Sequence, residues 1–205
     1  PAVWHRFTIY KLFFRNPSRD KDSDMNAKAA NDQDQPAAKK NFGLRPLPEN
    51  TVMGNPHVMI ATWFGVGRLR PAPGTLGTLA AIPFGYGIAY VSGIVGLALA
   101  ALLLLALGTM AANYYGRKSG EKDDQTIVVD EVVGMWIAAI PAALHIDLWI
   151  VAFLLFRLFD IYKPWPASFF DKRAGNGFDV MMDDVVAGIY AAIGVAACAV
   201  NLNMF

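Results

Sequence analysis

The sequence predicts an all-α protein, a multi-helical integral membrane bundle that contains helical hairpins. Three observations lead to this prediction. The 205 residues are 55% hydrophobic and only 17% charged, whereas an average soluble domain carries about 25% charged residues. The stretch from Pro71 to Gly116 holds 46 residues without one charge. The alternation of apolar and polar residues that marks strands is weak, so the apolar runs are expected to form helices.

The apolar runs place the expected helices. One crossing of a bilayer core needs about 20 apolar residues, so the uncharged stretch is long enough for two. We expect a first helix over Leu79–Ser92 and a second over Gly93–Ala112. The glycines near the junction of these two ranges provide the bend.

Two further apolar runs follow. Val132–Phe156 is interrupted in its middle by His145 and Asp147. This interruption favours a helical hairpin that dips into the membrane over two complete crossings. Val185–Phe205 is uncharged over 21 residues and is the last candidate for a crossing.

The composition also narrows the class of protein. The 18 basic and 17 acidic residues leave a formal net charge of +1, which is too balanced for a protein that neutralises the phosphates of a nucleic acid. The single cysteine, Cys198, has no second cysteine in the chain with which to form a disulfide. We therefore expect no nucleic-acid partner and a fold held by packing. The sequence leaves the oligomeric state unknown.

The charges divide the chain at residue 50. Residues 1–50 carry nine basic and six acidic side chains, and residues 51–205 carry nine and eleven. The run from Ser18 to Glu49 has almost no apolar side chains to bury, a composition typical of disordered tails. We expect a polar, disordered N-terminal arm over residues 1–50 and a helical membrane domain over residues 51–205.

Acidic residues gather at the ends of the apolar runs. If the runs fold as hairpins, the segments 71–78, 113–131 and 160–184 all emerge on one side of the bundle. Five carboxylates are then expected to meet there, from Asp130, Glu131, Asp160, Asp183 and Asp184. Because such a density of negative charge requires cations or protonation, we expect a one-sided functional site.

Each of these acids also has a structural explanation. The two acidic pairs each precede a helix, where the helix dipole stabilises an acid by about 0.3–1 kcal/mol. Asp160 comes three residues after Arg157, so the two side chains can form an ion pair. A charge at membrane depth, however, costs about 2.5–3.5 kcal/mol, which favours a functional reason for keeping it.

Magnesium suits a site built from carboxylates. It takes oxygen ligands, keeps several waters and is commonly held by one or two carboxylates together with a phosphate of the substrate. Zinc is excluded, because the chain has one cysteine and its histidines at positions 5, 57 and 145 lack the spacing of metal ligands.

A glycine-rich segment precedes the first long helix. Pro73, Gly74 and Thr75 would place backbone amides, a hydroxyl and a helix N-terminus where a phosphate can dock. A turn that merely opens a helix is the structural alternative. If the anion is a phosphate, two classes of phosphatase are excluded. Cys198 is not followed by the arginine that a cysteine phosphatase needs, and the pattern D-x-D-x-[TV] of the aspartyl-phosphate class is absent. The phosphatase chemistry that remains is one in which carboxylates act together with a metal ion.

Four segments, 61–84, 123–138, 156–171 and 176–191, closely resemble the successive motifs of the phosphatidylglycerophosphatase A family in order and spacing. The resemblance covers the chain from about Asn55 to the C-terminus. It implies a membrane-bound, magnesium-dependent lipid phosphatase that converts phosphatidylglycerophosphate to phosphatidylglycerol in phospholipid biosynthesis. It also implies a phospholipid substrate and a location in the bacterial inner membrane.

The family's motifs fall on particular positions of this sequence. Its V-D-E falls on residues 129–131, its F-R-x-x-D-x-x-K-P-x-P on 156–166 and its D-D-x-x-A-G on 183–188. Its P-G-T-x-G-S falls on 73–78, where a threonine at the last position keeps a hydroxyl. Trp63 and Asp179 depart from the family's pattern, and we assign no role to either.

These matches imply roles for the side chains. Metal ligands are expected among Asp130, Glu131, Asp160, Asp183 and Asp184. Catalytic roles are expected for Asp160, Arg157, Lys163 and Asp130. Substrate contacts are expected for Gly74, Thr75, Thr78, Arg157 and Lys163. Whether water or an aspartate attacks the phosphorus stays open, and Asp160 is the candidate nucleophile if an aspartyl phosphate forms.

The orientation follows from the basic residues. Six of them lie in loops expected on the same side as the acids: Arg117, Lys118, Lys122, Lys163, Lys172 and Arg173. Basic loops are typical of the cytoplasmic side, so the active site is expected to face the cytoplasm. Two other functions stay open, namely a non-catalytic helical membrane subunit whose acidic cluster binds ions, and a headgroup transferase that consumes a nucleotide-activated lipid.

Overall fold

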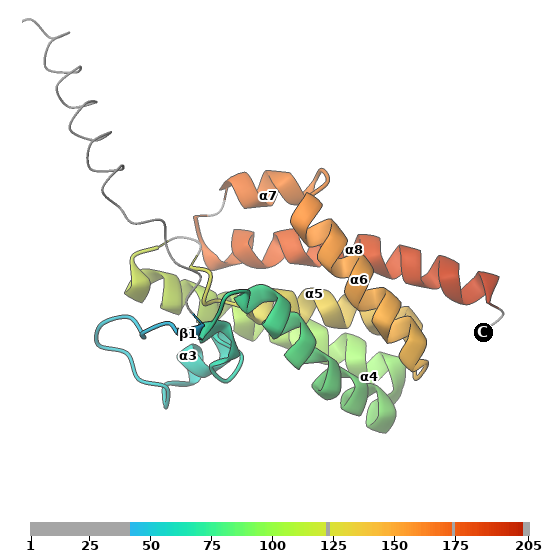
Figure 1. Ribbon diagram of the computed structural model, residues 1–205, viewed down its shortest axis with the longest axis horizontal. Helices are drawn as coiled ribbons and strands as arrows, with labels where there is room; N and C mark the ends of the chain where they lie inside the picture. The colour runs from blue at the N-terminus through green and yellow to red at the C-terminus, as the bar shows by residue number, and fades with distance from the viewer. Residues whose placement is uncertain (1–41, 122–123, 174, 203–205) are drawn as a thin grey trace, which may run out of the picture. The chain divides into compact units, whose positions relative to one another are not determined.

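The computed structural model describes residues 42–121, 124–173 and 175–202 (Figure 1). In these residues the chain forms six α-helices: α3 (Pro56–Ala61), α4 (Pro73–Ser119), α5 (Val129–Ala139), α6 (Ile146–Tyr162), α7 (Ala167–Arg173) and α8 (Gly177–Asn201). Two short 3₁₀ helices, η1 (Val66–Arg68) and η2 (Ile140–Ala142), and two strands of two residues each, β1 (Gly43–Leu44) and β2 (Leu69–Arg70), complete the fold. The predicted all-α class is confirmed.

Helix α4 is a hairpin of two helical halves. Gly93, between them, has φ 68° and ψ −173°, a conformation that is essentially restricted to glycine. The halves span about 30 Å and about 39 Å at 1.5 Å per residue, and Figure 1 shows them meeting at a sharp bend. The predicted bend is therefore confirmed.

The ends of α4 lie further out than the sequence indicated. The helix begins at Pro73 rather than Leu79, because a proline in the first turn has no N–H group that needs an acceptor. It continues to Ser119 rather than Ala112, and Gly120 then ends it in the left-handed conformation with φ 73°. The N-terminus of α4 consequently falls within the glycine-rich segment.

Helices α5 and α6 form the second hairpin, with η2 and His145 at the turn between them. This connection agrees with the interruption read from the sequence. Both helices pack on α8, which also contacts α4 and α7. The buried face of α8 is rich in small residues, including Ala187, Gly188 and Ala191, and small residues let helix backbones approach closely.

Large apolar side chains cover much of the outer surface of the bundle. On α6, Ile150, Leu154 and Leu158 recur at every fourth residue and are each more than half exposed. Within the described residues, α4 and α8 are the two helices that are long and apolar enough to cross a membrane. Only 17% of the most apolar window of α4 is buried inside the protein. An exposed apolar surface of this extent is typical of contact with lipid.

Residues 42–50 belong to the folded part of the chain, although the sequence placed them in the disordered arm. Strand β1 pairs with β2 in antiparallel register, with Gly43 opposite Arg70 and Leu44 opposite Leu69. The backbone N–H of Arg45 donates to the carbonyl of Arg68 over 2.8 Å. Composition alone did not predict this pairing, because the hydrogen bonds between strands join backbone groups and need no apolar side chains. The rest of the predicted arm, residues 1–41, lies outside the described residues.

The bend in α4 generates a test of stability. Gly93→Ala should lower the free energy of unfolding by about 1–3 kcal/mol, because an alanine is strained in the conformation of Gly93. Gly87→Ala is the matched control, since Gly87 lies in the same helix and an added Cβ there meets no atom within 4 Å. This control should be neutral or stabilising by up to about 1 kcal/mol. Unfolding in detergent measures both, and equal stabilities would contradict the assignment of the bend to Gly93.

Candidate active site

A cavity of about 410 Å³ opens where the ends of several helices meet. It is lined by residues from the start of α4, the segment before α5 and the first turn of α5, the end of α6, and helices α7 and α8. All five predicted carboxylates line it, from Asp130, Glu131, Asp160, Asp183 and Asp184. Gly74, Thr75, Arg157 and Lys163 line it as well. The segments that the sequence placed on one side of the bundle therefore do converge.

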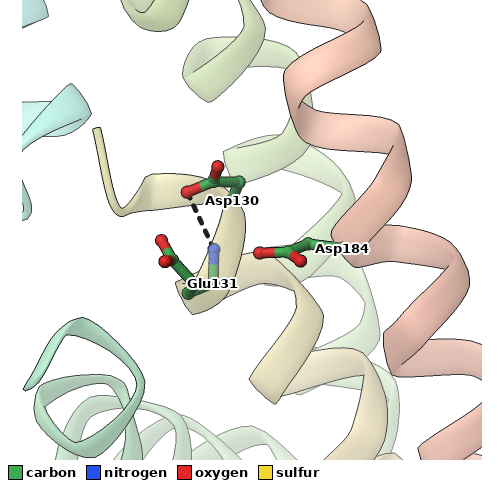
Figure 2. A group of neighbouring side chains, drawn as sticks. All are labelled: Asp130, Glu131 and Asp184. Atoms are coloured by element: carbon green, nitrogen blue, oxygen red, sulfur yellow. Dashed lines mark hydrogen bonds between the residues drawn. The ribbon is translucent and has the colours of Figure 1, made fainter. Parts of the chain in front are cut away.

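Three of the carboxylates form a tight group. Figure 2 shows Asp130 and Glu131 in the first turn of α5, facing Asp184 on α8. One carboxylate oxygen from each side chain lies within 4.8 Å of the other two. The carboxylate of Asp130 accepts a hydrogen bond of 3.0 Å from the backbone N–H of Glu131. This geometry suits one shared metal ion.

The close crossing of α5 and α8 sets the distance between these acids. A Cβ atom added to Gly188 would lie 2.6 Å from the carbonyl oxygen of Gly134, so the two backbones are in direct contact. Glu131 lies one helical turn before Gly134, and Asp184 lies one turn before Gly188. Contact between the two glycines therefore brings the carboxylates of both helices to the same end of the crossing.

Burial and mutual repulsion raise the pKa values of the two acids on α5. Loss of water raises the pKa of Glu131 to about 8; hydrogen bonding with Asp130 opposes this shift, and the charges of Asp184 and Asp160 add to it. Loss of water, followed by the charge of Glu131, raises the pKa of Asp130 well above its usual range. A bound cation would offset this repulsion and let the carboxylates be charged at neutral pH.

The other two acids are paired with basic side chains. Nη1 of Arg157 lies 2.5 Å from Oδ2 of Asp160. This contact is an ion pair without the alignment of a hydrogen bond, because Nη1 makes no hydrogen bond to any described residue. The ion pair that the i, i+3 spacing predicted is present. It holds both side chains at the wall of the cavity.

Lys163 is shared by two carboxylates. Its Nζ donates to Asp171 and to Asp183, in each case over 2.6 Å. Burial lowers the pKa of Lys163, but Asp183 and Asp171 raise it by more, so the net shift is upward and the ammonium stays charged. Lys163 ends α6 in the left-handed conformation, with φ 47°. This turn directs the chain away from α6 and into α7.

The N-terminus of α4 packs directly against the charged groups. A Cβ atom on Gly74 would lie 2.2 Å from Oε1 of Glu131 and 3.4 Å from Nη1 of Arg157. Only glycine lets the backbone of α4 approach these side chains so closely. Gly74 and Thr75 thus bring the start of the helix to the cavity, where unpaired N–H groups of a first turn favour an anion.

Thr78 is placed differently from its neighbours. It is fully buried, and its hydroxyl donates to the carbonyl oxygen of Gly74 over 2.8 Å. Gly74 and Thr75 line the cavity, whereas Thr78 supports the first turn of α4 from within. The family motif alone did not distinguish these positions, because the direction of each side chain depends on where the helix begins.

Two residues of the site were missed from the sequence. Asp171 binds Lys163, and Gln125 lines the cavity just before α5. None of the roles expected from the sequence falls on Asp171 or Gln125. The spacing of Asp171 from Lys163 gave no signal, since Pro164 and Pro166 separate them and the path of the chain between them is irregular.

The donor set fits a hard cation such as magnesium. The grouped side chains offer carboxylate oxygens only, which Mg²⁺ and Ca²⁺ prefer. Oε2 of Glu131 is buried and has no hydrogen-bond partner among the residues described. A buried acceptor without a partner is costly unless a proton or a cation satisfies it. The residues present are therefore suited to hold the ion that the motifs implied.

Fold and cavity together define the class. This is a helical protein with two helices apolar enough to cross a membrane, and its cavity holds an acidic cluster suited to a cation beside an arginine, a lysine and a helix N-terminus. The chain belongs to the phosphatidylglycerophosphatase A family, whose model matches residues 59–199. The resemblance of the four motifs is thereby confirmed.

Individual relatives agree with this membership. Phosphatidylglycerophosphatase A of Escherichia coli (strain K12) is 36% identical over 141 residues, which make up 68% of this chain and 81% of the relative. Phosphatidylglycerophosphatase A of Haemophilus influenzae is 41% identical over 154 residues, or 74% of this chain and 93% of the relative. A protein of Bacteroides thetaiotaomicron, provisionally named a phosphatidylinositol-3-phosphatase, is 38% identical over 146 residues, which make up 68% of this chain and 91% of the relative. No solved structure matches the chain.

The helix crossing generates a test of the site. Gly188→Ala should reduce turnover strongly, by about 100-fold or more, because a backbone contact of 2.6 Å forces α5 and α8 apart and moves Asp184 away from Glu131. Gly194→Ala is the matched control on the same helix. Its Cβ meets only the flexible end of Leu155, so activity should stay near that of the unmodified protein. Equal activities of the two variants would contradict the role of the crossing.

Proposed function

We propose that this chain is a magnesium-dependent lipid phosphatase that hydrolyses phosphatidylglycerophosphate to phosphatidylglycerol and phosphate. One observation carries the proposal: three grouped carboxylates line a single cavity together with Arg157, Lys163 and the N-terminus of α4. Such a cavity pairs a cation site with donors for a phosphate group. Membership of the phosphatidylglycerophosphatase A family supports this substrate.

The ligands that we propose for magnesium are Asp130, Glu131 and Asp184. They are a subset of the five acids expected from the sequence, and the remaining two are engaged by Arg157 and Lys163. A magnesium ion held there would neutralise charge on the phosphate and lower the pKa of a bound water. The carboxylates of α5 and α8 would hold the ion next to the glycine-rich start of α4.

Arg157 and Lys163, which line the same cavity, would bind the phosphate. The planar guanidinium of Arg157 presents several N–H donors that match phosphate oxygens, and its Nε has no hydrogen-bond partner within the described part of the chain. The charged ammonium of Lys163 adds a point charge. The amides around Gly74 and the hydroxyl of Thr75 would orient the same group. Thr78 would act indirectly, through the carbonyl of Gly74.

The attacking group stays open between water and Asp160. Asp160 lines the cavity and is held by Arg157, which is a suitable position both for a base that orients a water and for a carboxylate that attacks phosphorus. Trapping with labelled substrate separates these mechanisms, since only direct attack leaves phosphate covalently attached to the protein.

We place the protein in a bacterial inner membrane, with the cavity on the cytoplasmic side. The apolar surfaces of α4 and α8 support the membrane location. Basic residues of described segments near the ends of α4, α6 and α7 support the orientation; they are Arg117, Lys118, Lys163, Lys172 and Arg173. The lipid substrate would then reach the cavity from the inner leaflet.

Phosphate release tests the proposed function. Detergent-solubilised protein supplied with magnesium and phosphatidylglycerophosphate should liberate inorganic phosphate, and a chelator should stop the reaction. Asp160→Asn should reduce the rate by at least about 100-fold, because the variant lacks the carboxylate that either mechanism uses. A colorimetric assay for phosphate gives both results.

The control for this variant is Asp147→Asn. Asp147 is an exposed acid in the first turn of α6, at the opposite end of that helix from Asp160. Its amide variant should keep nearly full activity. Near-normal phosphate release by Asp160→Asn would remove Asp160 from the catalytic residues. No release by the unmodified protein would overturn the phosphatase and favour the non-catalytic ion-binding subunit.

A further inference from the structure

Gln125 lies at the boundary between two cavities. It lines the active-site cavity, and it also lines a second cavity of about 450 Å³ on the side of the β1 and β2 strands. Arg45 and Arg70 are part of the wall of the second cavity. Gln125 is exposed and stands five residues before Asp130, in the turn that leads into α5. Its side chain can therefore contact the part of a bound substrate that extends from the phosphate group towards the second cavity.

Arg45 fixes the side chain of Gln125. Its guanidinium Nη2 donates a hydrogen bond to Oε1 of Gln125, and its Nη1 lies 3.6 Å from Oδ1 of Asp124. Asp124 is itself fixed, since its Oδ1 accepts a hydrogen bond of 2.9 Å from the backbone N–H of Thr126. The amide of Gln125 is thus anchored from one side by a charged donor.

The backbone of Arg45 is held as firmly as its side chain. Its N–H donates to the carbonyl of Arg68, and its carbonyl accepts from Nε of Arg68, both over 2.8 Å. The pairing of β1 with β2 continues this contact. Arg45 lies before residue 59, where the match to the family model begins. A segment outside the matched region of this chain therefore positions a residue of the active-site wall.

The bond to Arg45 decides which end of the Gln125 amide is free. An arginine only donates hydrogen bonds, so it must be met by the carbonyl oxygen of the amide. The NH₂ group of Gln125 is then left as a donor for another partner. A neutral donor at the edge of a phosphate site suits the hydroxyl or the phosphodiester oxygens of a lipid headgroup.

We propose that Gln125 is a specificity-determining residue that donates a hydrogen bond to the glycerol phosphodiester part of the lipid headgroup, and that Arg45 is the positioning residue that orients it. This inference rests on the proposed function. The scissile phosphate is bound by Arg157, Lys163 and the start of α4, and Gln125 binds the part of the substrate that distinguishes it from inorganic phosphate.

Two measurements on the full chain separate headgroup binding from phosphate binding. The first is kcat/KM for phosphatidylglycerophosphate, and the second is the inhibition constant of inorganic phosphate, which lacks a headgroup. Gln125→Ala should lower kcat/KM by about fivefold to tenfold through KM, the effect of one lost hydrogen bond. The inhibition constant of phosphate should stay unchanged.

Gln125→Glu sharpens the test. Its carboxylate can still accept from Arg45 but has no N–H to donate, so kcat/KM should fall at least as far as in Gln125→Ala. Arg45→Ala should lower kcat/KM to a similar extent, and it should add nothing in a chain that already carries Gln125→Ala. Arg117→Ala, which removes an exposed arginine away from both cavities, is the matched control and should leave kcat/KM unchanged.

Each contrary outcome is distinct. Unchanged kcat/KM in Gln125→Ala would overturn the inference, and an equal weakening of phosphate inhibition would show that Gln125 binds the scissile phosphate instead. Additive losses from Arg45 and Gln125 would remove the positioning role of Arg45. If Arg45→Ala fails to fold, the exposed Gln125 variants still decide the headgroup contact. Failure of the proposed function is recognised separately, because the unmodified protein would then release no phosphate.

Discussion

The direct contact of α5 with α8 is the constraint on which the site depends. Charged carboxylates that are buried away from water repel one another strongly. Without a cation they would move apart or take up protons. Contact between Gly134 and Gly188 prevents separation, because the two helices pack backbone to backbone one turn away from the acids. Packing energy gained along the length of α8 thus holds the carboxylates together, and a bound cation would relieve their repulsion.

The acids of the cavity fall into two sets. Asp160, Asp171 and Asp183 are paired with Arg157 or Lys163, whereas the group of Asp130, Glu131 and Asp184 has no basic side chain bonded to it among the described residues. The basic side chains are thereby suited to an anion, and the unpaired acids are suited to a cation. A phosphate bound beside a metal ion would be stabilised by both.

The sequence predicted the helical class, the bend near Gly93 and the convergence of the acids. Uncharged runs indicate where helices form and a cluster of glycines indicates where the chain bends, so both can be read from short segments. The hairpins that follow bring the acids to one side. It did not predict the true start of α4, and the inward direction of Thr78 depends on that start. The contacts of Asp171 and Arg45 were also missed. Both join segments whose relative placement is set by tertiary packing, across two prolines in one case and across a pair of short strands in the other.

Magnesium binding as a function of pH tests the central claim most directly. The metal binds the charged carboxylate, and the pKa of Glu131 is raised to about 8. Titration calorimetry should therefore find tighter binding at pH 8 than at pH 6, with a proton released on binding. Asp184→Asn should abolish this binding. Affinity that does not change with pH, together with normal binding by the variant, would contradict a metal ion shared between α5 and α8.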